Sequence, residues 1–432
     1  MALREYLAQA LPDQEQFEIL HLQNPSKESH PVITPQSSNK SGLITVKNQH
    51  FFALFHKEKA IYALEIYVYI TLTPEVQDTI AERIVFVSKA DTNGYCDCEV
   101  SFKKITQQLL RYVLSINPNY YLQKVIPRHR EYHKFDKHLI TKKTKPTDAL
   151  RLLAKRQGDV SLMSSINLNV GIYHSFQCQP NIITKICLFT KPSPQYLFAE
   201  SSKNPKKHQL DGASLLKWWL DILDELIVEC FDQNTTANLR IPGEDETVVN
   251  RYLRGLKHNG WEAGDLFTKK SNEKHDLAAF RIPLFPDDPK SRFLHQLADE
   301  GRILSMYLKA YWAELQERQE FRLSVTVSVI GIQGHQAEEP IYVPNNKHDV
   351  FLTSSKKQFN SIKNYITGEA YDTIEGAFEA YLNVKYFLGD RFGRRLIKVE
   401  GVAKYRWIKK ESIEKRRQDI INTLSVRKKP KK

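Results

Sequence analysis

The chain has 432 residues and a mass of 50.2 kDa, and 41% of its residues are hydrophobic, which is enough for two or three typical domains or one large α/β domain with insertions. Its formal net charge of +13 favours acidic partners: nucleic acid, acidic proteins, phosphorylated cofactors or anionic membranes. Because no run approaches the roughly 20 apolar residues of a membrane span and the N-terminus lacks a signal-peptide core, we expect a soluble intracellular protein with no membrane partner.

The five cysteines argue against a metal site. They are odd in number and contain no CxxC pair, and Cys96 and Cys98 stand only two residues apart, with no paired-histidine motif after them. We interpret all five as reduced thiols of an intracellular protein and expect no metal. They are Cys96, Cys98, Cys178, Cys187 and Cys230.

The first 120 residues predict strands followed by a helix. Residues 50–55, 60–72 and 82–92 are rich in aromatic and β-branched side chains, which is typical of strands. In residues 101–116 the apolar side chains recur at helical spacing, and Pro118 ends the pattern. This order indicates a mixed α/β core.

Residues 128–156 interrupt the pattern with ten Lys and Arg against three acids. We expect a basic, partly disordered insertion at about 128–170, which is either a solvated loop or a docking surface for an acidic partner. The basic residues 401–432 are expected to form a disordered tail after a domain spanning residues 1–400. Such a tail also fits a nuclear import signal or an arm for an acidic partner.

The second half predicts alternating strands and helices. We expect strands at 181–192, 278–285 and 321–332, and helices at 212–231, 290–316, 356–366 and 373–388.

Several familiar catalytic motifs are absent from the sequence. It contains no GxxxxGK[ST] phosphate loop, no GxGxxG, no HExxH and no GxSxG elbow, which argues against a kinase or other nucleotide enzyme. It also has no RNP-type or zinc-finger motif, so we expect no direct sequence-specific binding of nucleic acid.

The stretch LFPDDPKSRF, residues 284–293, places Asp287 and Asp288 between two prolines at a predicted helix start. Because proline fixes φ and disfavours helix in the preceding residue, the turn is stiff and could display an acid to a substrate. The alternative is that Asp288 only caps the helix, with Pro289 as its first residue.

Loops that follow predicted strands offer candidate ligand contacts. Lysines and a histidine in these loops could face an anionic cofactor, and free NH groups at the start of the 101–116 helix could bind a pyrophosphate. The tandem Trp218 and Trp219 could line an acyl or lysine channel, or could simply pack in the core. The basic candidates are Lys89, Lys191, Lys206, Lys207 and His208.

Nine segments of the chain resemble a known family, the fungal-specific histone H3 lysine acetyltransferases of the regulator of Ty transposition type. The resemblance as a whole runs from the N-terminus to about Leu388. These segments are FVSKADTNGYC, INPNYYLQKVIPRHR, TKICLFTKPSPQYLF, SSKNPKKH, KWWLDILDELIVECF, LRIPGEDE, YLRGLK, IPLFPDDPKSRFLHQLA and WAELQERQEFRLSVT.

The resemblance implies a fold similar to the CREB-binding-protein acetyltransferases, a central mixed β-sheet surrounded by helices. It implies transfer from acetyl-CoA to core-region and tail lysines of newly synthesised histone H3, with H4, in the nucleus. It implies stimulation by an anti-silencing-function chaperone and a nucleosome-assembly-protein relative, in replication-coupled nucleosome assembly and the DNA damage response. The alternative is a non-enzymatic basic scaffold that binds histone chaperones or DNA.

The resemblance also implies roles for particular residues. The catalytic group would be Asp288, Asp287, Asp91, Trp219 and Tyr196, with Asp288 as our hypothesis for the general base, and Lys290 would be autoacetylated. Lysine and serine stand at 191 and 193, where the family pattern has arginine and alanine. The cofactor contacts would be Ala90, Asp91, Thr92, Glu99, Val100, Ser101, Phe102, Lys103, Phe189, Lys191, Ser193, His208, Gln209, Leu210 and Trp218.

Overall fold

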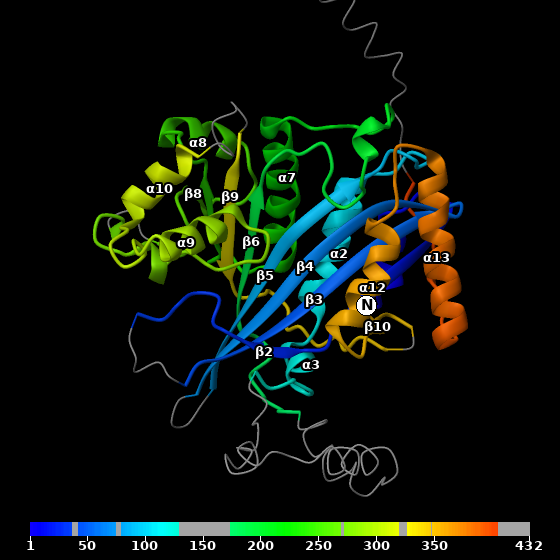
Figure 1. Ribbon diagram of the computed structural model, residues 1–432, viewed down its shortest axis with the longest axis horizontal. Coiled ribbons are helices and arrows are strands. Elements are labelled where there is room, and N and C mark those ends of the chain that lie inside the picture. The colour runs from blue at the N-terminus through cyan, green and yellow to red at the C-terminus, as the bar shows by residue number, and fades with distance from the viewer. Residues whose placement is uncertain are drawn as a thin grey trace, which may run out of the picture.

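The computed structural model describes residues 1–36, 42–74, 79–128, 173–268, 272–318, 326–346 and 348–404 (Figure 1). Nearly all of the expected basic insertion, and the tail from residue 405, lie outside these residues. The strands are β1 (Gln16–Gln23), β2 (Lys27–Ser29), β3 (Ile44–His56), β4 (Lys59–Pro74), β5 (Thr79–Thr92), β6 (Ile183–Thr190), β7 (Thr236–Arg240), β8 (Trp261–Ala263), β9 (Ser328–Gly334), β10 (Phe351–Leu352) and β11 (Ile397–Glu400).

The described α-helices vary from single turns to 19 residues. They are α1 (Leu3–Ala8), α2 (Phe102–Ser115), α3 (Pro118–Leu122), α7 (Gly212–Cys230), α8 (Glu246–Leu253), α9 (Pro289–Asp299), α10 (Leu308–Gln316), α12 (Lys356–Thr367) and α13 (Ile374–Phe392). None of the helices in the described ranges is both long and apolar enough to cross a membrane.

The strands form one mixed sheet in the order β10-β1-β3-β4-β5-β6-β9-β7-β8, with β11 paired to β1 and β2 paired to β3. The long neighbours β3, β4 and β5 pair antiparallel, whereas β5 and β6 run parallel. The parallel step needs a crossover, which contains α2 and α3. The predicted central mixed β-sheet with flanking helices is therefore confirmed.

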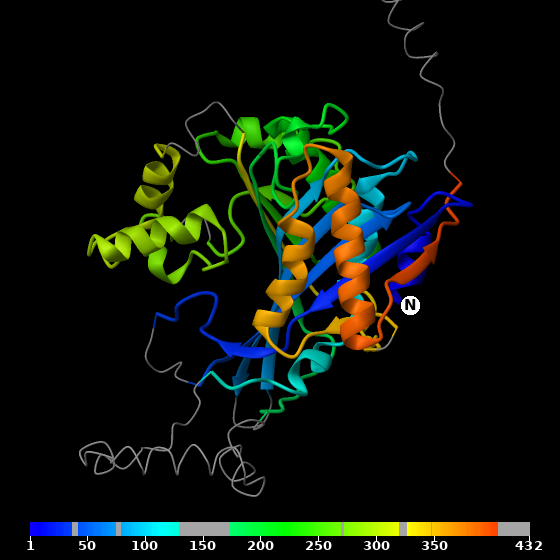
Figure 2. The same cartoon turned by 45° about the vertical axis from the view of Figure 1, so that its right-hand side comes forward.

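Helices cover both faces of the sheet, as Figures 1 and 2 show, with α2 and α7 on one face and α12 and α13 on the other. In β3, Phe52 and Leu54 join the core cluster that contains α2 and α7. Their neighbours Phe51 and Phe55 join the cluster that contains α12 and α13. Because successive side chains point to opposite faces, a strand buried on both faces becomes a continuous apolar run, here HFFALF.

Two predicted elements in the second half were wrong. Residues 278–285 were expected to form a strand, but residues 278–280 form a 3₁₀ turn, and no strand follows before α9. The single helix expected at 290–316 is two helices, α9 and α10, which pack together in a separate cluster with Phe293, Tyr311 and Trp312. The strand expected from residue 321 begins at Ser328 within the described part of the chain.

The C-terminal boundary also differs from the expected position at residue 400. β11 pairs antiparallel with β1, and the chain then continues along the N-terminal segment. The NH groups of Gly401, Val402 and Ala403 donate to carbonyls of Glu15, Ala8 and Leu11. Residues 401–403 therefore belong to the folded unit.

Candidate active site

A pocket of about 620 Å³ lies beside the C-terminal end of β5. Its walls come from the end of β5, the loop that follows it, the loop after β6, and the starts of α2 and α7. Fifteen residues predicted from the sequence line it: Ala90, Asp91, Thr92, Glu99, Val100, Phe102, Ser193, Tyr196, Lys206, Lys207, His208, Gln209, Leu210, Trp218 and Trp219.

Asp91 holds one wall of the pocket together. One carboxylate oxygen, Oδ2, accepts backbone NH groups from residues 196, 197 and 198 at 2.8, 2.8 and 3.2 Å. The other, Oδ1, accepts the NH of Thr92 at 2.9 Å and the Lys207 ammonium at 2.8 Å. The side chains of Asp91 and Lys207 are 3% and 5% exposed, so the pair is buried. Asp91 thereby ties the loop after β6 to the end of β5.

Lys207, a sequence candidate for an anionic cofactor, is committed to this network, because its ammonium also donates to Ser201 Oγ at 2.8 Å. The loop after β5 and the loop after β6 approach each other closely at Gly94, where φ is +85°. A Cβ at this position would lie 2.6 Å from the backbone nitrogen of Lys207, so only glycine fits. Lys206 and His208 line the pocket together with Lys207 and offer it further basic side chains.

The tandem tryptophans line the pocket and also pack against the core. Asp211 caps the start of α7, because its carboxylate accepts the Ser214 NH at 2.7 Å. Trp218 and Trp219 lie one to two turns further on, edge to face, with ring centroids 4.9 Å apart.

Tyr196 faces the pocket from the loop after β6, and its OH donates to the Lys191 carbonyl. Burial raises the pKa of its phenol, so the group stays protonated at neutral pH. A protonated phenol can donate a hydrogen bond but cannot act as a base at that pH.

Four predicted cofactor contacts do not line the pocket. Ser101 caps α2 by accepting the Lys104 NH at 3.3 Å. Lys103 pairs with Asp221 at 3.3 Å and so joins α2 to α7. Phe189 and Lys191 are also absent from the lining.

The turn with the two acids lies outside the pocket lining. Asp287 has φ of +56°, and its side chain, 62% exposed, pairs with Lys89 at 2.9 Å, a hydrogen bond that lowers the pKa of its carboxyl. Asp288 is buried and caps α9 by accepting the Lys290 NH at 3.0 Å. Its other oxygen pairs with the Lys290 ammonium at 2.6 Å.

The ammonium of Lys290 lies in a nearly closed environment. It stands 4.8 Å from the centre of the Phe189 ring, and its side chain is only 4% exposed. Phe189 and Lys290, predicted as a cofactor contact and a modified residue, are therefore neighbours in the structure.

Sequence reasoning missed several lining residues. Tyr62 on β4 bonds Thr106 of α2 at 2.7 Å and stacks on Phe102, with ring centroids 5.5 Å apart. Leu215 lies on α7, within the helix expected at 212–231. Cys96 and Cys98 were considered only as metal ligands and rejected, although both thiols reach the pocket wall.

Comparison with known proteins assigns the class. The family described as the histone acetyltransferase KAT11-type domain matches residues 3–387, nearly the whole described part of the chain. The chain belongs to this family and is a histone acetyltransferase.

The relatives narrow the assignment. Histone acetyltransferase RTT109 of Candida albicans is 31% identical over 360 residues, covering 81% of this chain and 91% of the relative. Histone acetyltransferase rtt109 of Schizosaccharomyces pombe is 33% identical over 150 residues, 31% of this chain and 37% of that protein. The crystal structure of Rtt109 from Aspergillus fumigatus has the same fold, with a TM-score of 0.66 at 17% identity. The superposed region covers 94% of this chain and 100% of the Aspergillus chain. The chain is of the Rtt109 type, as its motifs indicated.

Proposed function

We propose that the pocket beside β5 binds acetyl-CoA and that the enzyme transfers the acetyl group to core-region and tail lysines of newly synthesised histone H3. The observation that supports this most directly is the pocket's lining. Apolar surface from Trp218 and Leu215 is combined with basic side chains from Lys206 and His208. That mixture suits a ligand with an acyl-pantetheine arm and phosphates.

The chemistry requires a neutral amine. A lysine with a pKa of about 10.4 is less than 0.1% neutral at pH 7, so its proton must leave before or during attack. The nitrogen then bonds to the thioester carbonyl carbon, the C–S bond breaks, and the CoA sulfur leaves as a thiolate that takes up a proton. A carboxylate near the amine could accept the proton.

Asp288 is our proposal for that acceptor or for a group that orients the substrate amine. In the structure its two oxygens are engaged by the Lys290 NH and the Lys290 ammonium. Acetylation of Lys290 would remove the ammonium and leave one oxygen of Asp288 able to accept a proton. Autoacetylation would therefore convert a buried ion pair into an available base.

Asp91 has a different proposed role. Its oxygens are occupied by four backbone NH groups and one ammonium, none of which acetylation of Lys290 would remove. We assign Asp91 as a positioning residue that shapes the pocket, with Tyr196 presented on the loop that it holds.

The partners that we propose are histone H3 with H4, an anti-silencing-function chaperone and a chaperone of the nucleosome-assembly-protein family. Histones are basic, and so is this chain, with a net charge of +13. An acidic chaperone that presents the histone would relieve the repulsion between two cationic proteins. The proposed setting is replication-coupled nucleosome assembly and the DNA damage response, in the nucleus.

The test is transfer of radiolabelled acetyl from acetyl-CoA to H3–H4, with and without each chaperone. Leu210→Trp fills the pocket, so it should abolish saturable acetyl-CoA binding and transfer. Leu304→Trp makes the same change at a side chain that is 70% exposed and outside the pocket, and it should behave like the wild type. Full acetyl-CoA binding by the Leu210→Trp protein would place the donor elsewhere. Equal transfer to H2A–H2B would remove the H3 assignment.

A further inference from the structure

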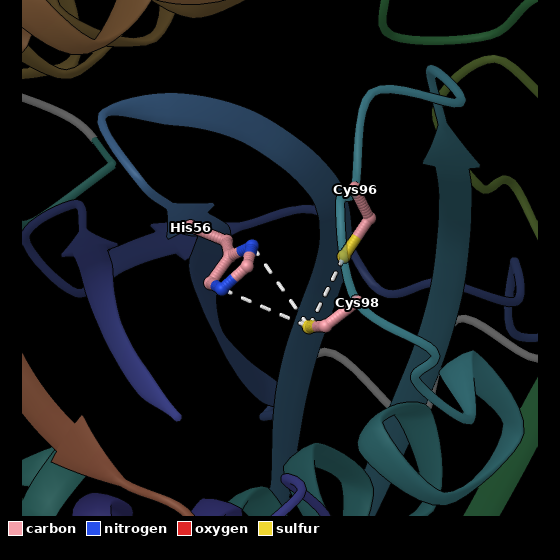
Figure 3. A group of neighbouring side chains, drawn as sticks. All are labelled: His56, Cys96 and Cys98. Carbon is pink, nitrogen blue, oxygen red and sulfur yellow. Dashed lines mark hydrogen bonds between the residues drawn. The ribbon is translucent and has the colours of Figure 1, made fainter. Parts of the chain in front are cut away.

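The thiols of Cys96 and Cys98 meet a histidine that the sequence places 42 residues away from Cys98. His56 ends β3, and the two cysteines lie on the loop after β5. Figure 3 shows the imidazole and both sulfur atoms turned toward one another. The sulfur of Cys98 lies 3.8 Å from that of Cys96, and 3.7 and 3.9 Å from Nε2 and Nδ1 of His56. One donor atom from each residue falls within 4.8 Å of the other two.

The separations of the Cys98 sulfur from the Cys96 sulfur and from the imidazole nitrogens are close to the spacing of ligands around tetrahedral zinc. With Zn–S near 2.3 Å and Zn–N near 2.05 Å, tetrahedral angles separate two sulfurs by about 3.8 Å and a sulfur from a nitrogen by about 3.6 Å. We propose that His56, Cys96 and Cys98 form a binding site for one zinc-class ion at the wall of the pocket. The donor set of two thiolates and one imidazole selects zinc over magnesium or calcium.

A second contact orients the histidine as zinc sites require. Nε2 of His56 lies 3.0 Å from a carboxylate oxygen of Glu15. With the Nε2 hydrogen donated to Glu15, Nδ1, which lies 3.9 Å from the Cys98 sulfur, is the nitrogen left to hold the ion, and the carboxylate would be its hydrogen-bonding partner, as in carboxylate–histidine–zinc sites. The imidazole side chain is fully buried and stacks on Phe17 with ring centroids 4.6 Å apart, so its position is fixed before any ion arrives.

The two cysteines would be the anionic ligands of the ion, because the neighbouring carboxylate already has a partner. The Asp97 carboxylate, between them in sequence, pairs with the Lys59 ammonium and is not needed by the ion. Two thiolates balance the charge of a divalent ion. Because both cysteines also line the pocket, water from the pocket can fill the fourth position that three protein ligands leave open.

The experiment is a titration of the reduced, full-length protein with Co²⁺, followed by displacement with Zn²⁺. We expect one Co²⁺ per chain and a thiolate-to-cobalt charge-transfer band that Zn²⁺ abolishes. Cys98→Ser and Cys96→Ser should remove most of the band, while Cys230→Ser, a matched change at a cysteine outside the cluster, should keep it. Circular dichroism checks the fold of each variant.

Because His56 is buried and its replacement could unfold the protein, Glu15→Gln provides a milder variant. It should weaken Co²⁺ binding by about 10- to 100-fold with the band retained at saturation. The proposal is overturned if the reduced wild type gives no charge-transfer band, or if the band survives in Cys98→Ser. The proposal is also overturned if mass spectrometry detects a Cys96–Cys98 disulfide and the protein takes up no metal after that disulfide is reduced.

Discussion

Replacing Asp91 with asparagine tests whether this acid positions the pocket or reacts. An amide can keep its oxygen at the Oδ2 position, where three backbone NH groups converge. Its NH₂ group then meets the Thr92 NH and the Lys207 ammonium, which are both donors. The ammonium is left unpaired while only 5% exposed. Breaking a buried pair by removing one partner costs about 3–5 kcal/mol, so we expect Asp91→Asn to lower the free energy of unfolding by that amount.

The assays are urea unfolding, calorimetry with acetyl-CoA, and steady-state kinetics. We expect weaker acetyl-CoA binding and a raised KM, because the loop at 196–198 loses its attachment to β5. Adding Lys207→Met removes the unpaired charge, so the double variant should be less destabilised than the sum of the two single variants. The reasoning is refuted if Asp91→Asn unfolds within about 1 kcal/mol of wild type and binds acetyl-CoA normally while kcat collapses. That outcome would place Asp91 among the reacting groups.

Two further predictions concern other buried groups. Asp288→Asn should abolish most turnover while acetyl-CoA affinity stays nearly unchanged. Lys290→Arg keeps the charge but cannot be acetylated, so this variant should lose activity. Full activity of Lys290→Arg would contradict the proposed role of acetylation. The linked pair His21 and His50, with ring nitrogens 2.8 Å apart, is fully buried, and burial lowers the pKa of His21 to about 3 and that of His50 well below its usual range. The unfolded chain therefore takes up protons below pH 6.5 that the folded chain refuses, and stability falls by about 1.4 kcal/mol per histidine between pH 7.5 and 5.5. In urea unfolding at both pH values, His50→Asn should remove about half of the loss of stability that this pair causes between pH 7.5 and 5.5. His30→Asn, a variant at an exposed site, should leave that loss unchanged. If the loss of stability is also unchanged in His50→Asn, the buried pair is not its source.

The strands of the central sheet could be predicted because burial on both faces produces long apolar runs, as in β3 and β4. The failures have local causes. Pro283 and Pro286 break any ladder in residues 278–285, although the segment is rich in apolar side chains. The helix expected at 290–316 stops at Gly301, where φ is +69° and the Arg302 NH returns to the Leu297 carbonyl, as at a glycine-terminated helix end.

The site was predictable where its residues share a loop motif and not where they meet across the fold. Fifteen lining residues were named from contiguous segments. The partnership of Asp91 with Lys207 spans 116 positions, and that of Cys98 with His56 spans 42. Neither spacing matches a motif, because the sheet register and the loop after β6 bring these side chains together. The CxC spacing gives no sign of His56, because the antiparallel pairing of β3, β4 and β5 brings this histidine to the two cysteines.

Asp91 and Asp288 are both buried acids with a lysine partner. They differ in whether a chemical modification can remove the hydrogen-bond donors that surround the carboxylate. Four of the five groups bound to Asp91 are backbone NH groups, which no modification takes away. Asp288 has one backbone NH and one ammonium, and the ammonium belongs to a residue two positions along the same helix. Acylation of that amine needs only the reaction that this family catalyses. A carboxylate whose counter-charge can be removed by the enzyme's own chemistry is the better candidate for accepting the substrate proton, and this difference is why we assign positioning to Asp91 and proton transfer to Asp288.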